Sequence, residues 1–179
     1  QIEMPSANLS VERVWNDPMP EVSLRYKNLT KVYFKVVDYS WEKNVRSGMH
    51  SPDFLNHPEY RQLASAKALR EWSADLPETA DYRERTENIA VPNDLKSGFY
   101  MLVSSFDPDF KDENGNRIDY TGFWVSDLAL IVRTADNENT VEGFVLNAIT
   151  GDPVKGATVE GWGRTRDWKR TKVETTKTD

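Results

Sequence analysis

Polar and apolar residues alternate with a period of two over residues 21–39. The apolar positions of this alternation are Val22, Leu24, Tyr26, Val32, Phe34 and Val36. Successive side chains of a β-strand point to opposite faces, so this period is typical of half-buried strands. Residues 28–30 (NLT) interrupt the pattern as a turn would. The stretch therefore predicts a β-hairpin with one apolar face.

Further strands are predicted along the rest of the chain. Residues 99–105 and 123–133 are nearly continuous apolar runs, which are typical of strands at the centre of a sandwich. A short edge strand is expected within 9–15, and other strands at 87–91, 141–148, 157–162 and 172–178. These patterns predict a mostly β protein with an immunoglobulin-like β-sandwich.

One segment, residues 51–76, breaks the β pattern. Its apolar residues recur at spacings of three or four, at Leu63, Ala66, Leu69 and Trp72. That spacing forms one apolar stripe on a helix, and Pro58 suits the first helical position. Leu76 precedes a proline and should end the helix. The segment therefore predicts a helical insertion with a helix over 58–76. It would cover the open side of a sheet or, alternatively, bind a partner.

A change in composition divides the chain. Residues 134–140 (TADNENT) are polar and predict a linker. We therefore expect a first β-sandwich domain over 1–133 and a second β-domain over 141–179. The second stretch has about three strands, too few to bury a stable core without help. It is expected either to dock on the first domain or to be the start of a truncated domain.

Charge and composition exclude several classes of function. The chain has 179 residues, a net charge of −6 and 11% aromatic residues, and its pI is about 5.1. A nucleic-acid-binding protein usually needs a clustered cationic face, so no nucleic acid is expected as a partner. The one dense basic stretch alternates with Thr, Asp and Trp and predicts a solvated strand face. It consists of Arg164, Arg166, Lys169, Arg170 and Lys172.

The chain contains no cysteine, which excludes a disulfide framework, a thiolate nucleophile, a cysteine-ligated metal and an internal thioester. No apolar run approaches the roughly 20 residues of a membrane span. A G-x-S-x-G turn, a G-x-G-x-x-G loop and a Walker-type loop are all absent. We therefore expect no enzyme, no catalytic residue and no cofactor within this chain.

The densest group of oxygen ligands lies in the connection 107–120. It contains Asp107, Asp109, Asp112, Asn114, Asn116 and Asp119. Calcium takes six to eight oxygen ligands, so the loop is a candidate calcium site. The spacing lacks the pattern of an EF-hand loop, and Asn114-Gly115 is typical of a tight turn. A plain loop is the competing interpretation, and no metal site is assigned.

Two other groups of residues could in principle form binding sites. His50 and His57 lie seven positions apart, but Pro52 and Pro58 argue against one helix that would bring them to a common metal. Stacked aromatic rings on a sheet face could bind a sugar, although such rings more often pack in the core. The tryptophans considered for this role are Trp41, Trp72, Trp124, Trp162 and Trp168.

Two parts of the chain resemble a known family. The first comprises YKNLTKVYFKV at 26–36, LPETADY at 76–82 and IAVPNDLKSGFYMLVSS at 89–105; the second comprises FWVSDLALIVR at 123–133 and GFVLNAITGDPVKGATVEGW at 143–162. In the second part, Gly151 would supply a turn, and Gly156 would let the return strand lie close. Residues 150–159 of this part form the pattern T-G-x-P-V-x-G-A-x-V. Carboxypeptidase regulatory-like and transthyretin-like modules share this pattern.

These stretches resemble the opening domains of bacterial alpha-2-macroglobulin family proteins, with 123–162 at the junction of two macroglobulin-type domains. The resemblance implies a non-catalytic module of a large envelope protein, lipoprotein or secreted protein that traps proteases. A bait segment is cleaved in that family, and the array of domains closes on the attacker. Neighbouring domains of the same chain would be the module's direct partners, and proteases would be targets of the full-length protein. No residue that performs the trapping can be carried over to this chain.

Two alternatives remain open at this point. The chain could be a cell-surface module that binds carbohydrate or protein, which predicts exposed tryptophans grouped on one sheet face. It could also be an accessory domain of a secreted hydrolase. In each case the expected location is the cell envelope, in the periplasm or attached to the outer membrane, or outside the cell.

Overall fold

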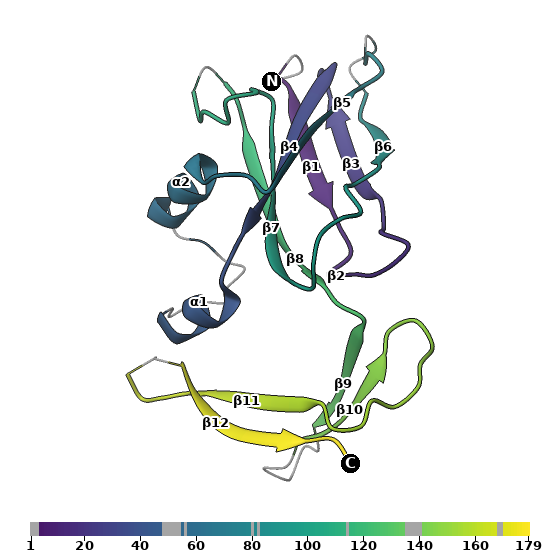
Figure 1. The fold of residues 1–179 in the computed structure, drawn as a ribbon. Coiled ribbons are helices and arrows are strands. Elements are labelled where there is room, and N and C mark those ends of the chain that lie inside the picture. Colours follow the sequence, from purple (N-terminus) through teal and green to yellow (C-terminus); the bar gives the residue numbers. More distant parts are fainter. Residues whose placement is uncertain are drawn as a thin grey trace. The chain divides into compact units, whose positions relative to one another are not determined.

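A computed structural model gives the architecture of the chain (Figure 1). It describes residues 4–47, 55, 57–79, 81, 83–113, 115–134, 141–167 and 170–179, except for the side chains of Ser47, His57 and Thr134. Strands far outweigh helices among the described residues, which confirms the prediction of a mostly β protein. The chain divides into two compact units, one comprising Gln1–Ser40 and Asp53–Val125 and the other Trp41–Pro52 and Ser126–Asp179.

The first unit is built from two sheets. The smaller sheet has the strand order β1-β3-β6, and these strands are β1 (Ser6–Ser10), β3 (Val22–Lys27) and β6 (Arg85–Ile89). The larger sheet has the order β2-β8-β7-β4-β5. Its strands are β2 (Val14–Trp15), β8 (Ile118–Val125), β7 (Gly98–Ser105), β4 (Lys31–Asp38) and β5 (Arg70–Asp75). All neighbours in both sheets are antiparallel except β2 and β8.

The hydrophobic core draws side chains from both sheets. Leu24 of β3 and Phe34 of β4 are fully buried in one cluster. Trp15 stacks on Phe123 of β8, with 3.7 Å between the ring centroids. Because alternate side chains of each strand enter this cluster, the two sheets form a sandwich around it. The predicted sandwich architecture is therefore confirmed, with β7 at the centre of the larger sheet.

The predicted hairpin over 21–39 was wrong in its pairing, although its two strands form where the alternation placed them. β3 pairs with β1 and β6, whereas β4 pairs with β5 and β7. The intervening turn carries the chain from one sheet to the other, and Asn28 in it has a φ of 56°. A period of two shows only that each strand has one apolar face directed at a core. Two strands in facing sheets show this pattern as well as the two strands of one hairpin do.

The predicted helix over 58–76 was also wrong in extent. Helix α2 covers His57–Ser65, and the chain then forms the edge strand β5. Trp72 lies on β5 and stacks on Phe34 with 5.2 Å between the ring centroids. Trp72, Ala74 and Leu76 follow a period of two, which is typical of a strand, although Trp72 also fits the helical spacing. The segment forms a strand because it pairs with β4. Residues 51–54 and 56 of the predicted insertion lie outside the described residues.

The second unit contains two β-hairpins and helix α1 (Trp41–Ser47). One hairpin joins β9 (Leu128–Thr134) to β10 (Val141–Asn147), and the other joins β11 (Thr158–Arg164) to β12 (Arg170–Lys177). The run 123–133, predicted as one strand of the first domain, is therefore two strands. β8 ends at Val125, and β9 belongs to the second unit because it pairs with β10.

The boundary between the units consequently falls between Val125 and Ser126, before the predicted linker at 134–140. Of that linker, residues 135–140 lie outside the described residues. The predicted strands at 141–148, 157–162 and 172–178 form as β10, β11 and β12, with small shifts at their ends.

Candidate functional site

The candidate calcium loop between β7 and β8 is held together by Asn116. The Asn116 side-chain amide donates to the carbonyl oxygen of Lys111 at 2.5 Å and to Ser105 Oγ at 2.9 Å. Its Oδ1 accepts a hydrogen bond from the Phe106 backbone N–H at 2.8 Å. This side chain, considered above as a calcium ligand, is therefore committed to tying the two ends of the loop together.

The carboxylates of the loop have separate partners. Asp107 Oδ1 accepts from the Asp109 backbone N–H at 2.7 Å, and Asp109 pairs with Lys111 at 3.0 Å. Asp119 lies on β8, where its oxygens accept from the backbone N–H groups of Tyr120 and Leu9. Asp112 is exposed, and Asn114 lies outside the described residues. Within the described ranges, no three His, Cys, Asp or Glu residues gather into a group that could hold a metal ion.

The histidines give no metal geometry. His57 begins α2, but its side chain is outside the described part of the chain, as is all of His50. The structure therefore neither brings the pair together nor separates it.

The described tryptophans that are candidates for sugar stacking are divided between the two units. Trp72 packs against the core on the edge strand β5, and Trp162 lies in the other unit on β11. Trp124 on β8 is 37% exposed and packs beside Phe99, with 5.0 Å between the ring centroids. Trp41 begins α1, and Trp168 lies outside the described residues. The described residues thus form no row of exposed tryptophans of the kind that sugar stacking needs.

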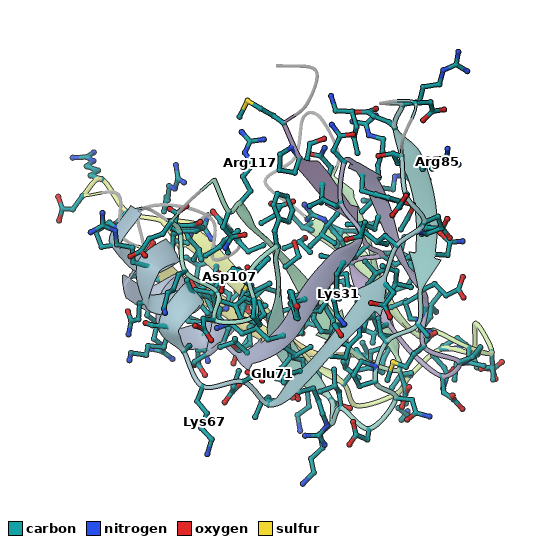
Figure 2. All side chains as sticks on the ribbon, turned by 90° about the horizontal axis from the view of Figure 1, so that it is seen from above. Lys31, Lys67, Glu71, Arg85, Asp107 and Arg117 are labelled. Atoms are coloured by element: carbon teal, nitrogen blue, oxygen red, sulfur yellow. The ribbon has the colours of Figure 1, made fainter. Side chains whose placement is uncertain are left out.

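The basic stretch is divided between two strands and their turn. Lys172 of β12 pairs with Glu160 of β11, and Lys169 lies outside the described residues. Charged side chains are also spread widely over the chain, as the labelled Lys31, Lys67, Arg85 and Arg117 show (Figure 2). This arrangement agrees with the predicted solvated strand face.

Hydrogen bonds join two of the family-like stretches, YKN at 26–28 and LPET at 76–79. The Tyr26 hydroxyl donates to the carbonyl oxygen of Pro77 at 2.9 Å. The Asn28 backbone N–H donates to Thr79 Oγ1 at 2.6 Å, and Thr79 is buried. YKN at 26–28 spans the end of β3, and LPET at 76–79 follows β5. These hydrogen bonds therefore link two of the places where the chain passes from one sheet to the other, after β3 and after β5. The sequence alone did not reveal this role.

The β9–β10 hairpin carries the most exposed apolar surface in the described residues. The residues concerned are Leu128, Leu130, Ile131, Val132, Val141 and Phe144, each between 47% and 64% exposed. Ile131 lies opposite Phe144, and Leu130 lies opposite Val145, so the exposed apolar residues occupy both faces of the hairpin. We refer to these six residues as the apolar hairpin surface.

Comparison with known proteins gives a likeness in fold. No protein-family model matches the chain, and no curated protein matches its sequence. Native alpha-2-macroglobulin from Escherichia coli spanning domains NIE-MG1 matches with a TM-score of 0.61 and 13% identity, over 99% of this chain and 84% of that chain. The same protein spanning domains MG0-NIE-MG1 matches with a TM-score of 0.62 and 15% identity, over 98% of this chain and 58% of that chain. The chain has the fold of these macroglobulin domains.

This macroglobulin-type fold confirms the resemblance found in the sequence, at the level of the fold. The matched span includes both units, so the likeness extends to the T-G-x-P-V-x-G-A-x-V stretch between β10 and β11. Gly151 there has a φ of 77°, which confirms its turn role. Gly156 has a φ of 75° and open space around it, so it is needed for backbone conformation and not for close approach.

The described helices are all too short and polar to cross a bilayer.

Proposed function

We propose that the chain is a non-catalytic structural module of a large alpha-2-macroglobulin-like protein whose full-length form traps proteases. The observation that carries the proposal is the likeness in fold to the E. coli protein over 98–99% of this chain. On this proposal, the two units correspond to two consecutive domains, and the trapping chemistry lies in other parts of the full-length protein.

The apolar hairpin surface supports a role in contacts between domains. A β-hairpin with apolar side chains on both faces is an aggregation hazard unless another element covers it. The six residues are each between 47% and 64% exposed, so the described part of the chain leaves them uncovered. We assign the cover to a neighbouring domain of the same protein. The candidate calcium loop and the tryptophans offer no comparable surface, because their groups have partners within the chain or lie apart.

The proposed location is the cell envelope, in the periplasm or attached to the outer membrane as a lipoprotein, or outside the cell. The full-length protein would then meet proteases from outside the cell.

The test uses the full-length gene product. Mixed with an active protease, it should be cleaved in a bait segment and then block cleavage of a protein substrate by that protease. A hydrophobic dye should bind the isolated 179-residue chain at the apolar hairpin surface and bind weakly at that surface in the full-length protein. Full-length protein that is cut without blocking the protease, or a gene product that ends near residue 180, would contradict the proposal.

A further inference from the structure

Helix α1 has an unusual place in the chain. In sequence it lies between β4 and α2, which both belong to the first unit, yet α1 itself is part of the second unit and contacts β12. A helix of seven residues is too short to be stable alone in water. Its own sequence helps, because Glu42 in the first turn and Arg46 in the last turn suit the helix dipole and pair at 2.6 Å. Val45 of α1 is fully buried and the helix contacts β12, so packing adds to its stability.

One contact between α1 and the β11–β12 hairpin is made at Trp162 of β11. The Arg46 guanidinium lies over the Trp162 ring, 5.1 Å from its centroid. Lys172, the direct partner of Trp162 on β12, places its ammonium group 5.8 Å from the same centroid. A cation within about 6 Å of an indole centroid is attracted by the electron-rich face of the ring. Trp162 therefore receives one cation from its own hairpin and one from α1.

Both cations are oriented by carboxylates. Arg46 is held by Glu42 on the same helix, and Lys172 by Glu160 on the neighbouring strand. Arg46 and Lys172 together lower the pKa of the Glu42 carboxyl, with the Arg46 hydrogen bond as the main cause. The Arg46–Glu42 pair lies within α1 and the Lys172–Glu160 pair within the hairpin. The two cations at the Trp162 ring are therefore each neutralised by a carboxylate of their own element.

The β11–β12 hairpin needs such support. An isolated two-stranded hairpin is at best marginally stable in water. β12 is exposed at nearly every position, and in the described residues these two strands pair only with each other. Hydrogen bonds between Thr178 and residues 154–157 hold the open end of the hairpin. The contact with α1 supports it at Trp162, nearer its turn.

We propose that Trp162 is the docking residue for α1, and that α1 is a strap that stabilises the β11–β12 hairpin. The strap ties the folding of this hairpin to a segment inserted between two elements of the first unit. This inference concerns the chain itself and does not rest on the proposed function.

Hydrogen exchange measured residue by residue on the whole chain tests the strap. Arg46→Ala should speed the exchange of β11 and β12 amides about two- to fivefold, the effect of losing one partly exposed cation–π contact. Amides of β4 and β7 should exchange at the wild-type rate. Arg61→Ala is the matched control, because it removes an exposed arginine from the other helix, α2.

The contact is isolated by repeating Arg46→Ala in a Trp162→Leu background. The strap predicts that Arg46→Ala then has no further effect on β11 and β12, because the ring that Arg46 contacts is already gone. Wild-type exchange of these strands in Arg46→Ala would overturn the proposal. An equal effect of Arg46→Ala with and without Trp162 would also overturn it.

Discussion

Lys35 is the clearest case in which a single residue departs from what its sequence position suggests. In the alternation of β4 it occupies a polar position, which predicts a solvent-facing side chain, yet only 4% of it is exposed. Its ammonium group donates to the carbonyl oxygens of Ala64 at 2.5 Å and Ala66 at 3.3 Å, at the end of α2. It also lies 4.4 Å from the centroid of the Phe110 ring. Alternation revealed the strand but not that α2 and the 107–120 loop cover its second face.

Lys35→Met should therefore lower the free energy of unfolding of the first unit. The change keeps most of the apolar stem but leaves the last carbonyls of α2 without their donor, at a cost of about 1–3 kcal/mol. Urea unfolding followed by circular dichroism would measure it. Lys31→Met is the control, since Lys31 lies on the same strand but is exposed, and its ion-pair partner Asp75 is exposed as well. An equal loss in both variants would show that the capping contact contributes nothing.

At the scale of elements, the sequence predicted where strands form better than which strands pair. β7 is a nearly continuous apolar run and lies at the centre of its sheet, as predicted, because both of its faces are buried. β3 and β4 were also placed correctly, but their assignment to different sheets depends on contacts with β6 and β7, far away in the sequence. No local pattern encodes those contacts.

The candidate sites show the same limit. The sequence identified Asn116 as a candidate oxygen ligand of calcium. Its role in holding the loop together is seen only in the structure, where its amide group donates hydrogen bonds to Ser105 and Lys111. The hydrogen bond between Asn28 and Thr79 could not be predicted either, since the two residues lie 51 positions apart and neither residue type is unusual in a turn.

The β9–β10 hairpin contains a close approach that requires glycine. A Cβ at Gly143 would lie 3.0 Å from the backbone oxygen of Ile131, and that oxygen cannot move without shifting β9. Gly143→Ala should therefore destabilise the hairpin by about 1–3 kcal/mol, the range for overpacking. Exchange of the β9 and β10 amides should rise accordingly. Gly161→Ala is the control, because its Cβ would meet Glu174 Cβ at an ordinary 3.5 Å, and an equal effect there would contradict the steric account.

At the scale of the whole molecule, the division into two units could be predicted only in part. The polar stretch 134–140 suggested a boundary, because polar residues without a period usually connect domains. The actual division comes earlier, between Val125 and Ser126, since β9 finds its partner strand in the second unit. The helix α1 was not assigned to that unit by any sequence pattern. Membership of a unit is decided by packing partners, and the composition of a stretch does not encode those partners.

Three tyrosines, of which Tyr26 and Tyr100 are buried and Tyr60 is half-buried, report on the integrity of the first unit as a whole. Burial raises the pKa of Tyr26, Tyr60 and Tyr100 above the ordinary 10.0, with smaller contributions from nearby carboxylates. Each hydroxyl also donates a hydrogen bond to a backbone oxygen, of Pro77, Ile118 and Lys96 respectively. The folded chain should therefore ionise these tyrosines later than the unfolded chain does.

The sign of the resulting pH dependence follows from proton binding. Between pH 10.0 and the raised values, the unfolded chain has released tyrosine protons that the folded chain still holds, so stability falls as pH rises. Lys35 gives the opposite slope, because burial lowers its pKa, but it is one group against three. Near-ultraviolet absorbance of tyrosinate should thus show a late phase in the folded protein, reduced in Tyr26→Phe. In urea all seven tyrosines should titrate together, and a single phase in the folded protein as well would show that these hydroxyls are not buried as described.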